Sequence, residues 1–221
     1  MKRYQLWLAG LFFVASCTDA QTNKNQQAFA DLPTPKANGK VATFAGGCFW
    51  ALAEGMSELK GVDKVISGYS GGTVKNPTYE EVCSDNTGHA ESVQVYYDPT
   101  IISYAQLSEA FFYAHDPTTL NRQGPDEGED YRSVAFYRNP EEKKILEQVM
   151  ARVNAGHHYS DKIVTQLVPF KVFYPAENYH QNYYRLNPDN DYIQSVSKPK
   201  VLKLRKNMNA LIKSEFKDKT K

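Results

Sequence analysis

The sequence predicts an α+β fold: a two-layer α/β sandwich with a split-βαβ (ferredoxin-like) core, extra helices and long loops. Two observations predict it. Short apolar or alternating stretches typical of strands are interspersed with stretches of helical periodicity, and both tight turns and longer crossovers join them. The chain has 221 residues, of which 41% are hydrophobic. This is enough for one core and too little for two large domains.

The first half of the domain should contain three strands and three helices. The apolar run before Gly46-Gly47 reads as a buried strand. A later stretch alternates in polarity and stops at Asp98-Pro99. We predict strands over residues 41–45, 62–67 and 89–97, and helices over 51–60, 78–83 and 103–114.

The second half should contain further strands, helices and one long polar loop, which is often functional in folded domains. Apolar residues after Pro199 recur at helical spacing among lysines, which predicts a basic amphipathic helix that packs on the domain rather than on a membrane. The other elements are a loop over 115–130, a strand over 131–138, a helix over 140–154, a strand pair or bent strand over 163–173 and a helix over 177–186.

The N-terminus has the pattern of an export signal: basic residues, an apolar stretch from Leu6 to Ala15, and then Ser16-Cys17. Val14 to Cys17 resembles a bacterial lipobox, in which Cys17 would carry a lipid; an ordinary cleaved signal is the alternative. We predict a signal peptide over 1–16, a lipid-anchored flexible linker over 17–39 and the catalytic domain over 40–221. The protein would then be an exported bacterial lipoprotein, anchored to a membrane on the periplasmic side of the cell envelope.

Charge and cysteine content narrow the classes of partner. Without Lys2 and Arg3, 24 basic residues (26 − 2) face 25 acidic ones, so no nucleic-acid partner is indicated. A lipidated Cys17 leaves only Cys48 and Cys83 as thiols, which excludes a disulfide framework. No spacing matches a zinc site, and we expect no metal, no bound cofactor and a monomer.

Cys48 is the first candidate catalytic residue. It follows Gly46-Gly47 at the junction of a predicted strand and helix. The free N–H groups of a helix's first turn favour an anion, which lowers a thiol pKa and produces the reactive thiolate. Phe49 and Trp50 would then form a small apolar pocket. A buried structural cysteine is the alternative.

Several motifs together resemble the peptide-methionine sulfoxide reductase A family over about residues 41–188. They are GGCFW at 46–50, GYSGG at 68–72, and the longer stretches 77–99, 121–133 and 176–188. The resemblance implies an α+β sandwich and thiol-dependent reduction of methionine S-sulfoxide, in proteins and free, through a sulfenic acid on Cys48. It also implies a role in the repair of oxidised proteins.

The resemblance also implies a role for each matching position. The nucleophile is Cys48, the acid is Glu91, and the hydroxyl donors are Tyr79 and Tyr131. The remaining matches are Asp126 among the catalytic residues, and Phe49, Trp50, His180 and Tyr183 among those that bind substrate.

The chemistry explains why a glutamate is needed. A sulfoxide sulfur accepts a thiolate only if its oxygen is protonated or strongly hydrogen-bonded, so the acid must be neutral. An apolar aromatic pocket would raise the pKa of Glu91 enough to keep its proton. A surface glutamate on a wet strand face is the alternative.

The sequence departs from the common family pattern at its C-terminus, because residues 191–221 contain no cysteine. An external thiol is therefore expected to reduce the sulfenic acid: a thioredoxin-like protein, a glutaredoxin-like protein or a small thiol. Cys83 could resolve it, but a structural role is preferred.

Two other functions remain open. A thiol hydrolase or acyltransferase would use Cys48 with a histidine base and would need no reductant. A lipoprotein binding module would use the aromatic pocket without chemistry and would not need the cysteine.

Overall fold

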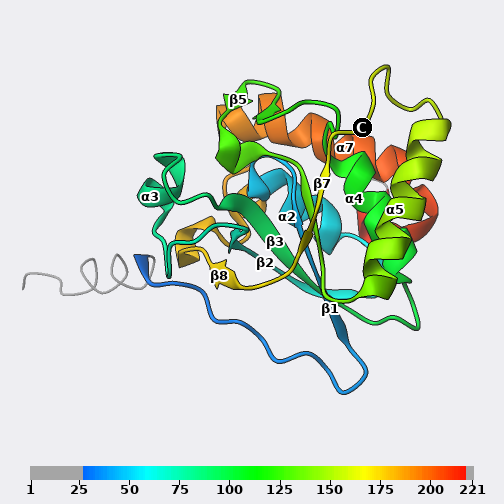
Figure 1. The fold of residues 1–221 in the computed structure, drawn as a ribbon, viewed down its shortest axis with the longest axis horizontal. Coiled ribbons are helices and arrows are strands. Elements are labelled where there is room, and N and C mark those ends of the chain that lie inside the picture. The colour runs from blue at the N-terminus through cyan, green and yellow to red at the C-terminus, as the bar shows by residue number, and fades with distance from the viewer. Residues whose placement is uncertain (1–26, 218–221) are drawn as a thin grey trace, which may run out of the picture.

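The computed structural model describes residues 27–217, which form one antiparallel sheet core with helices packed on it (Figure 1). The four core strands lie in the order β6-β1-β3-β2, and all three pairs are antiparallel. This is the split-βαβ arrangement predicted from the sequence. The strands are β1 (Lys40–Ala45), β2 (Val62–Ser70), β3 (Ala90–Tyr97) and β6 (Val134–Tyr137).

Two further strands extend this sheet, one at each edge. β7 (Gln166–Pro169) pairs parallel with β6, and β8 (Phe173–Pro175) pairs antiparallel with β2. The sequence predicted a strand pair or a bent strand here. The two strands do not pair with each other, because they lie at opposite edges of the sheet.

Three helices pack on the sheet or on one another. They are α2 (Phe49–Ser57), α4 (Tyr104–Ala114) and α5 (Pro140–Ala155). Phe44 of β1 stacks on Phe111 of α4 with ring centroids 4.7 Å apart, in the centre of the core. α7 (Lys198–Asn207) packs on α2 and α4 from outside and adds a third layer. The predicted packing of this basic helix on the domain is confirmed.

Three of the helices begin directly after a residue whose side chain caps the helix N-terminus. The Ser103 side chain accepts a hydrogen bond from the backbone amide of Gln106, and the Gln106 side-chain oxygen accepts one from the backbone amide of Ser103. Thr78 caps the short helix α3 (Tyr79–Cys83) in the same way, and Asn139 caps α5. Such caps satisfy amides that have no partner within the helix.

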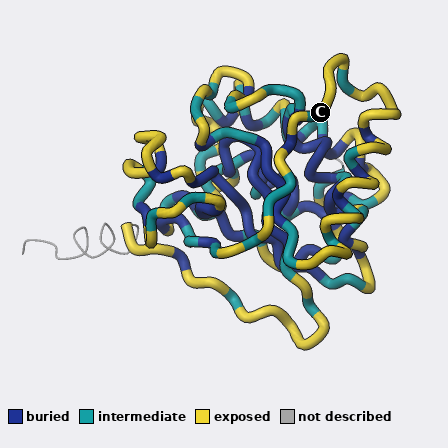
Figure 2. The backbone as a smooth tube through the Cα atoms, in the orientation of Figure 1, coloured by how far each residue is buried: buried dark blue, intermediate teal, exposed yellow. Residues whose placement is uncertain are grey.

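Both faces of β3 are covered, so all eight of its residues are buried (Figure 2). Helices cover one face. On the other, Phe173 packs with Tyr96 and Ile66, and Phe170 lies against the same cluster. The alternation seen in the sequence therefore separates two buried faces, not a dry face from a wet one.

The segment predicted as one helix over 177–186 is two short pieces. They are a 3-10 turn, η2 (Asn178–His180), and α6 (Tyr183–Leu186). Asn182 between them has a left-handed backbone, with φ 56°. Since an α-helix needs negative φ at every residue, the helix cannot continue through it. The following π-helical turn, η3 (Ile193–Ser197), leads into α7.

The N-terminal segment follows the outside of the sheet before it enters β1 (Figure 1). Phe29 forms an isolated antiparallel β-bridge with Glu177. Two backbone hydrogen bonds hold this contact: the Ala30 amide donates to the Ala176 carbonyl (3.0 Å), and the Asn178 amide donates to the Ala28 carbonyl (2.8 Å). Part of the predicted flexible linker over 17–39 is therefore docked on the domain.

The predicted signal peptide and Cys17 lie outside the described residues. Between residues 27 and 217, no helix has both the length and the apolar character that a membrane span requires.

Candidate active site

Two glycines shape the turn that carries Cys48 from β1 into α2. Gly47 has φ +74°, and a Cβ there would lie 2.2 Å from the side chain of Gln123. A Cβ on Gly46 would lie 2.9 Å from the ring of His115. Only glycine allows this close approach. Cys48 is the N-cap of α2, which begins two residues earlier than predicted, so the thiol stands just before the first turn rather than in it.

Glu91 comes from β3 and meets the start of α2. Its side chain is 1% exposed, and its Oε2 accepts a hydrogen bond from the Phe49 amide at 2.9 Å. Burial raises the pKa of Glu91 to about 8, although the Phe49 amide opposes the shift. The carboxyl is therefore neutral at neutral pH. The predicted burial and raised pKa are confirmed, and the alternative of a surface glutamate is wrong.

The electrostatics of Cys48 differ from the expectation. Burial raises the pKa of the Cys48 thiol well above its usual value, and the charge of Glu91 raises it further. The Trp50 amide and the Tyr192 hydroxyl favour the thiolate but do not prevail. The prediction of a lowered pKa is wrong for the resting site, because it considered the helix start and not the loss of water around a side chain that is 7% exposed.

Tyr79 and Tyr131 lie near Glu91, as predicted. Tyr79 is the first residue of α3, and Tyr131 ends the 3-10 turn η1 (Glu129–Tyr131). Burial, with the charge of Glu91, raises the pKa of both phenols, so both remain hydroxyl donors. Each phenol is close enough to Glu91 to sense its charge, so two hydroxyls and one carboxyl surround the same region.

Trp50 is held by residues that follow β8 in the chain. Its ring stacks on Tyr183 with centroids 3.9 Å apart, and its indole N–H donates to Nδ1 of His180 at 3.2 Å. His180 also contacts the rings of Phe49 and Tyr79, at 4.9 and 4.5 Å. Burial lowers the pKa of His180 to about 4, so it is neutral and positions the aromatic residues.

Asp126 joins the site through two residues that the sequence analysis missed. It starts β5 (Asp126–Glu127), which forms a hairpin with β4 (Arg122–Gln123) inside the long polar loop. The Tyr192 hydroxyl donates to Oδ2 of Asp126 at 2.5 Å and also contacts Cys48. Lys200 Nζ lies 4.0 Å from the same oxygen. No motif marked Tyr192 or Lys200; only the packing of the C-terminal segment brings them here.

Cys83 ends α3 and is exposed. It shares a hydrogen bond with the Tyr79 hydroxyl, and burial of part of its side chain raises its pKa to about 11. The exposed position shows that Cys83 does not belong to the core, while its structural role stays a prediction that the contact with Tyr79 supports. Among the described residues, Cys48 and Cys83 are both free thiols.

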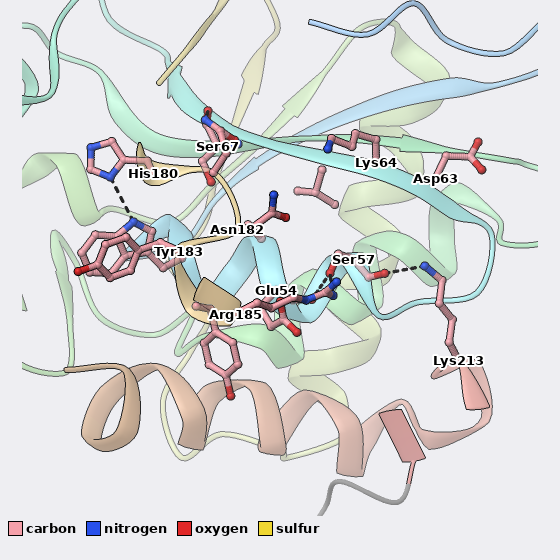
Figure 3. Close-up of a pocket in the computed structure, with 15 residues that line it drawn as sticks. Glu54, Ser57, Asp63, Lys64, Ser67, His180, Asn182, Tyr183, Arg185 and Lys213 are labelled. Atoms are coloured by element: carbon pink, nitrogen blue, oxygen red, sulfur yellow. Dashed lines mark hydrogen bonds and ion pairs between the residues drawn. The ribbon is translucent and has the colours of Figure 1, made fainter. Parts of the chain in front are cut away.

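A separate polar cavity of about 220 Å³ lies between α2, β2 and α6 (Figure 3). Trp50, His180 and Tyr183 line it, but Cys48 and Glu91 do not. Glu54 and Arg185 face each other within it as a 2.6 Å ion pair. The aromatic residues thus have this cavity on one side and contribute to the Cys48 site as well.

No cluster of three metal-binding side chains occurs within residues 27–217.

The fold and site define a cysteine enzyme of α+β architecture, with a buried thiol, a neutral carboxyl and tyrosine hydroxyls in aromatic surroundings. The sequence model of the family described as "Peptide methionine sulfoxide reductase" matches residues 40–212. The chain belongs to this family.

Individual relatives agree. The peptide methionine sulfoxide reductase MsrA of Leptospira borgpetersenii serovar Hardjo-bovis is 52% identical over 160 residues, which cover 72% of this chain and 90% of the relative. That of Saccharolobus solfataricus is 51% identical over 76% of this chain and 93% of its own. Among solved structures, reduced Mxr1 from Saccharomyces cerevisiae superposes with a TM-score of 0.67 at 34% identity, covering 72% of this chain and 91% of the Mxr1 chain.

Proposed function

We propose that this protein reduces methionine S-sulfoxide, free and in oxidised proteins, to methionine, and so repairs oxidised proteins. One observation carries the proposal: a neutral, buried Glu91 carboxyl is held at the same helix start as the Cys48 thiol by the Phe49 amide. Family membership supports the reaction class.

The proposed reaction uses both groups. The Cys48 sulfur attacks the sulfoxide sulfur while Glu91 donates its proton to the sulfoxide oxygen. The proton that leaves the thiol restores Glu91, and the attack forms a bond between the two sulfurs. This S–S bond and the S–O bond of the substrate then break as the hydroxyl group passes to the Cys48 sulfur, which leaves a sulfenic acid on Cys48 and a free thioether. The substrate sulfur is reduced to a thioether and the cysteine sulfur is oxidised. The resting site suits this scheme because both groups are protonated at neutral pH.

Tyr79 and Tyr131 would hydrogen-bond the sulfoxide oxygen as its charge changes. Their hydroxyls stay protonated because burial raises both pKa values. Phe49 and Trp50 would hold the substrate methyl group. One fixed pocket presents only one epimer's oxygen to Glu91, so only one epimer should react. We propose that it is the S epimer, as the family resemblance implies.

We propose that an external thiol, most simply a thioredoxin-like protein, reduces the sulfenic acid. Two thiol groups are consumed: the first forms a mixed disulfide with Cys48 and releases water, and the second releases Cys48 as a thiol. Residues 191–221 contain no cysteine that could take the first step within the chain. Glutaredoxin-like proteins and small thiols fit the same chemistry.

The hydrolase alternative finds no suitable base in His180 or His115, the two histidines that contact residues 46–50. His180 uses Nδ1 to accept from Trp50, and His115 bonds the Phe111 carbonyl and the Ser133 hydroxyl. Burial lowers both histidine pKa values, to about 4 and about 3. Neither is arranged to take a proton from Cys48. The binding-module alternative does not explain why the Cys48 thiol and the Glu91 carboxyl occur together in one site.

The cellular setting is a proposal from the sequence. We propose that the protein is exported, that a lipid on Cys17 anchors it to a membrane on the periplasmic side, and that it acts as a monomer. The support is the basic, apolar and lipobox pattern of residues 1–17.

Separate assays on resolved epimers of methionine sulfoxide, with dithiothreitol as reductant, test the proposed function. We expect turnover of the S epimer, none of the R epimer, and none by Cys48→Ser. Continued turnover without any reductant, beyond one product per enzyme molecule, would instead indicate the hydrolase chemistry, and equal rates on both epimers would refute the pocket argument.

A further inference from the structure

Lys200 carries a buried ammonium group that makes no hydrogen bond with the described residues. It lies at the third position of α7, its side chain is 14% exposed, and its Nζ is buried without a hydrogen-bond partner. Asp126 Oδ2, at 4.0 Å, is too far for a hydrogen bond but close enough for an ion pair. Burying an ammonium in this state is costly, so a compensating role should exist.

The surroundings of Lys200 indicate what that role is. Its charge interacts with Asp126, with Cys48 and with Glu91, and burial lowers its pKa while all three raise it. The other titratable groups facing this region are Tyr192, which bonds Asp126, and His115, whose pKa Lys200 helps to lower. Lys200 is thus a cation close enough to Cys48 for the two charges to interact.

The Tyr192 hydroxyl has a single proton and two possible acceptors. In this structure it donates to Asp126, yet the same hydroxyl contacts Cys48 and favours the thiolate. If it turned to the sulfur, Asp126 would lose its donor in a largely buried position. Lys200 is the nearby group that can compensate that carboxylate, because its Nζ lies 4.0 Å away and makes no hydrogen bond to another group.

We propose that Lys200 is a positioning residue that stabilises the Cys48 thiolate: by balancing the charge of Asp126, it frees the Tyr192 hydroxyl to donate to the sulfur. The inference rests on the proposed role of Cys48 as nucleophile. It adds a residue from the C-terminal segment to the activation of a thiol that burial otherwise keeps protonated.

Alkylation of Cys48 by iodoacetamide tests this without any sulfoxide, so its outcome is independent of the reductase activity. The reagent is uncharged, and mass spectrometry of the Cys48 peptide separates it from Cys83. Rates are measured over a pH range of about 6 to 10 for wild type, Lys200→Met and Lys200→Arg. Lys206→Met is the matched control, because Lys206 is exposed on the same helix.

We expect Lys200→Met to alkylate about tenfold more slowly at neutral pH, which corresponds to a rise of one unit in the thiol pKa. Lys200→Arg and Lys206→Met should behave as wild type, and rescue by arginine excludes a folding defect as the cause. In a Tyr192→Phe background, Lys200→Met should have little further effect.

Three results would overturn the proposal. Unchanged alkylation of Lys200→Met would show that the lysine does not affect the thiol. An equal slowing by Lys206→Met would mean that only the overall charge of α7 matters. An undiminished effect in the Tyr192→Phe background would exclude the route through Tyr192.

Discussion

Glu91 accepts a 2.9 Å hydrogen bond from the backbone amide of Phe49, the first residue of the helix that follows Cys48. One helix start therefore holds both the thiol and the carboxyl. The backbone amide is a rigid donor, so the distance between acid and nucleophile is set by β3 and α2 and not by flexible side chains. The following predictions depend on this arrangement.

Glu91→Gln should fold normally and lose most of its activity. The amide oxygen can still accept from Phe49, but the side chain can no longer deliver a proton. General acid catalysis contributes about 10² to 10⁴ in rate, so we expect a loss of kcat in that range with S-sulfoxide as substrate. Glu80→Gln, at an exposed position on α3, is the matched control. A wild-type rate for Glu91→Gln would rule out its role as the acid.

The same substitution should change how stability depends on pH. Glu91 has a raised pKa of about 8 in the folded protein, against about 4.3 in an unfolded chain. As pH rises between these values, only the unfolded chain ionises, so the wild type loses stability by about 1.4 kcal/mol per unit of pKa difference.

Glu91→Gln lacks this loss. Its free energy of unfolding relative to wild type, measured by urea denaturation, should therefore increase from about pH 5 to pH 8 and then level off. A constant difference across this range would mean that the Glu91 carboxyl is already ionised in the folded protein.

Without reductant, the enzyme should form one product per molecule and stop as a sulfenic acid on Cys48. No cysteine lies in residues 191–221 to condense with it. A sulfenic-acid-specific label on the Cys48 peptide, quantified by mass spectrometry, is the measurement. Cys83→Ser should give the same stoichiometry. Because Cys83 is an exposed thiol bonded to Tyr79, a Cys48–Cys83 disulfide is the outcome that would make Cys83 the resolving residue.

In cells, the protein should fractionate with membranes through a lipid on Cys17. Several acyl chains anchor a protein stably, whereas one binds only weakly. Cys17→Ala should abolish lipid attachment, as judged by mass spectrometry of the N-terminal peptide, while Cys83→Ser should not. Recovery of unmodified wild-type protein from the soluble exported fraction would contradict the lipobox interpretation.

Local sequence patterns were sufficient wherever the structure depends on neighbouring residues. Ser103 and Thr78 cap their helices as their spacing to Gln106 and Glu81 indicates, and Gly46-Gly47 separates strand from helix. The helix predicted over 177–186 failed because nothing local shows that Asn182 adopts a left-handed backbone. That conformation depends on the packing of the residues on either side of it.

By itself, the sequence determined the split-βαβ order of elements and the cysteine at a helix start, because these follow from periodicity and turns. The set of motif residues around that cysteine came from the resemblance to a known family. Only the tertiary structure decided the electrostatics of the site. Burial raises the pKa of both Cys48 and Glu91, and burial is a property of what packs around a residue. Tyr192 and Lys200 reach Asp126 from more than 60 residues away in the chain, and such contacts arise only when α7 packs against the core.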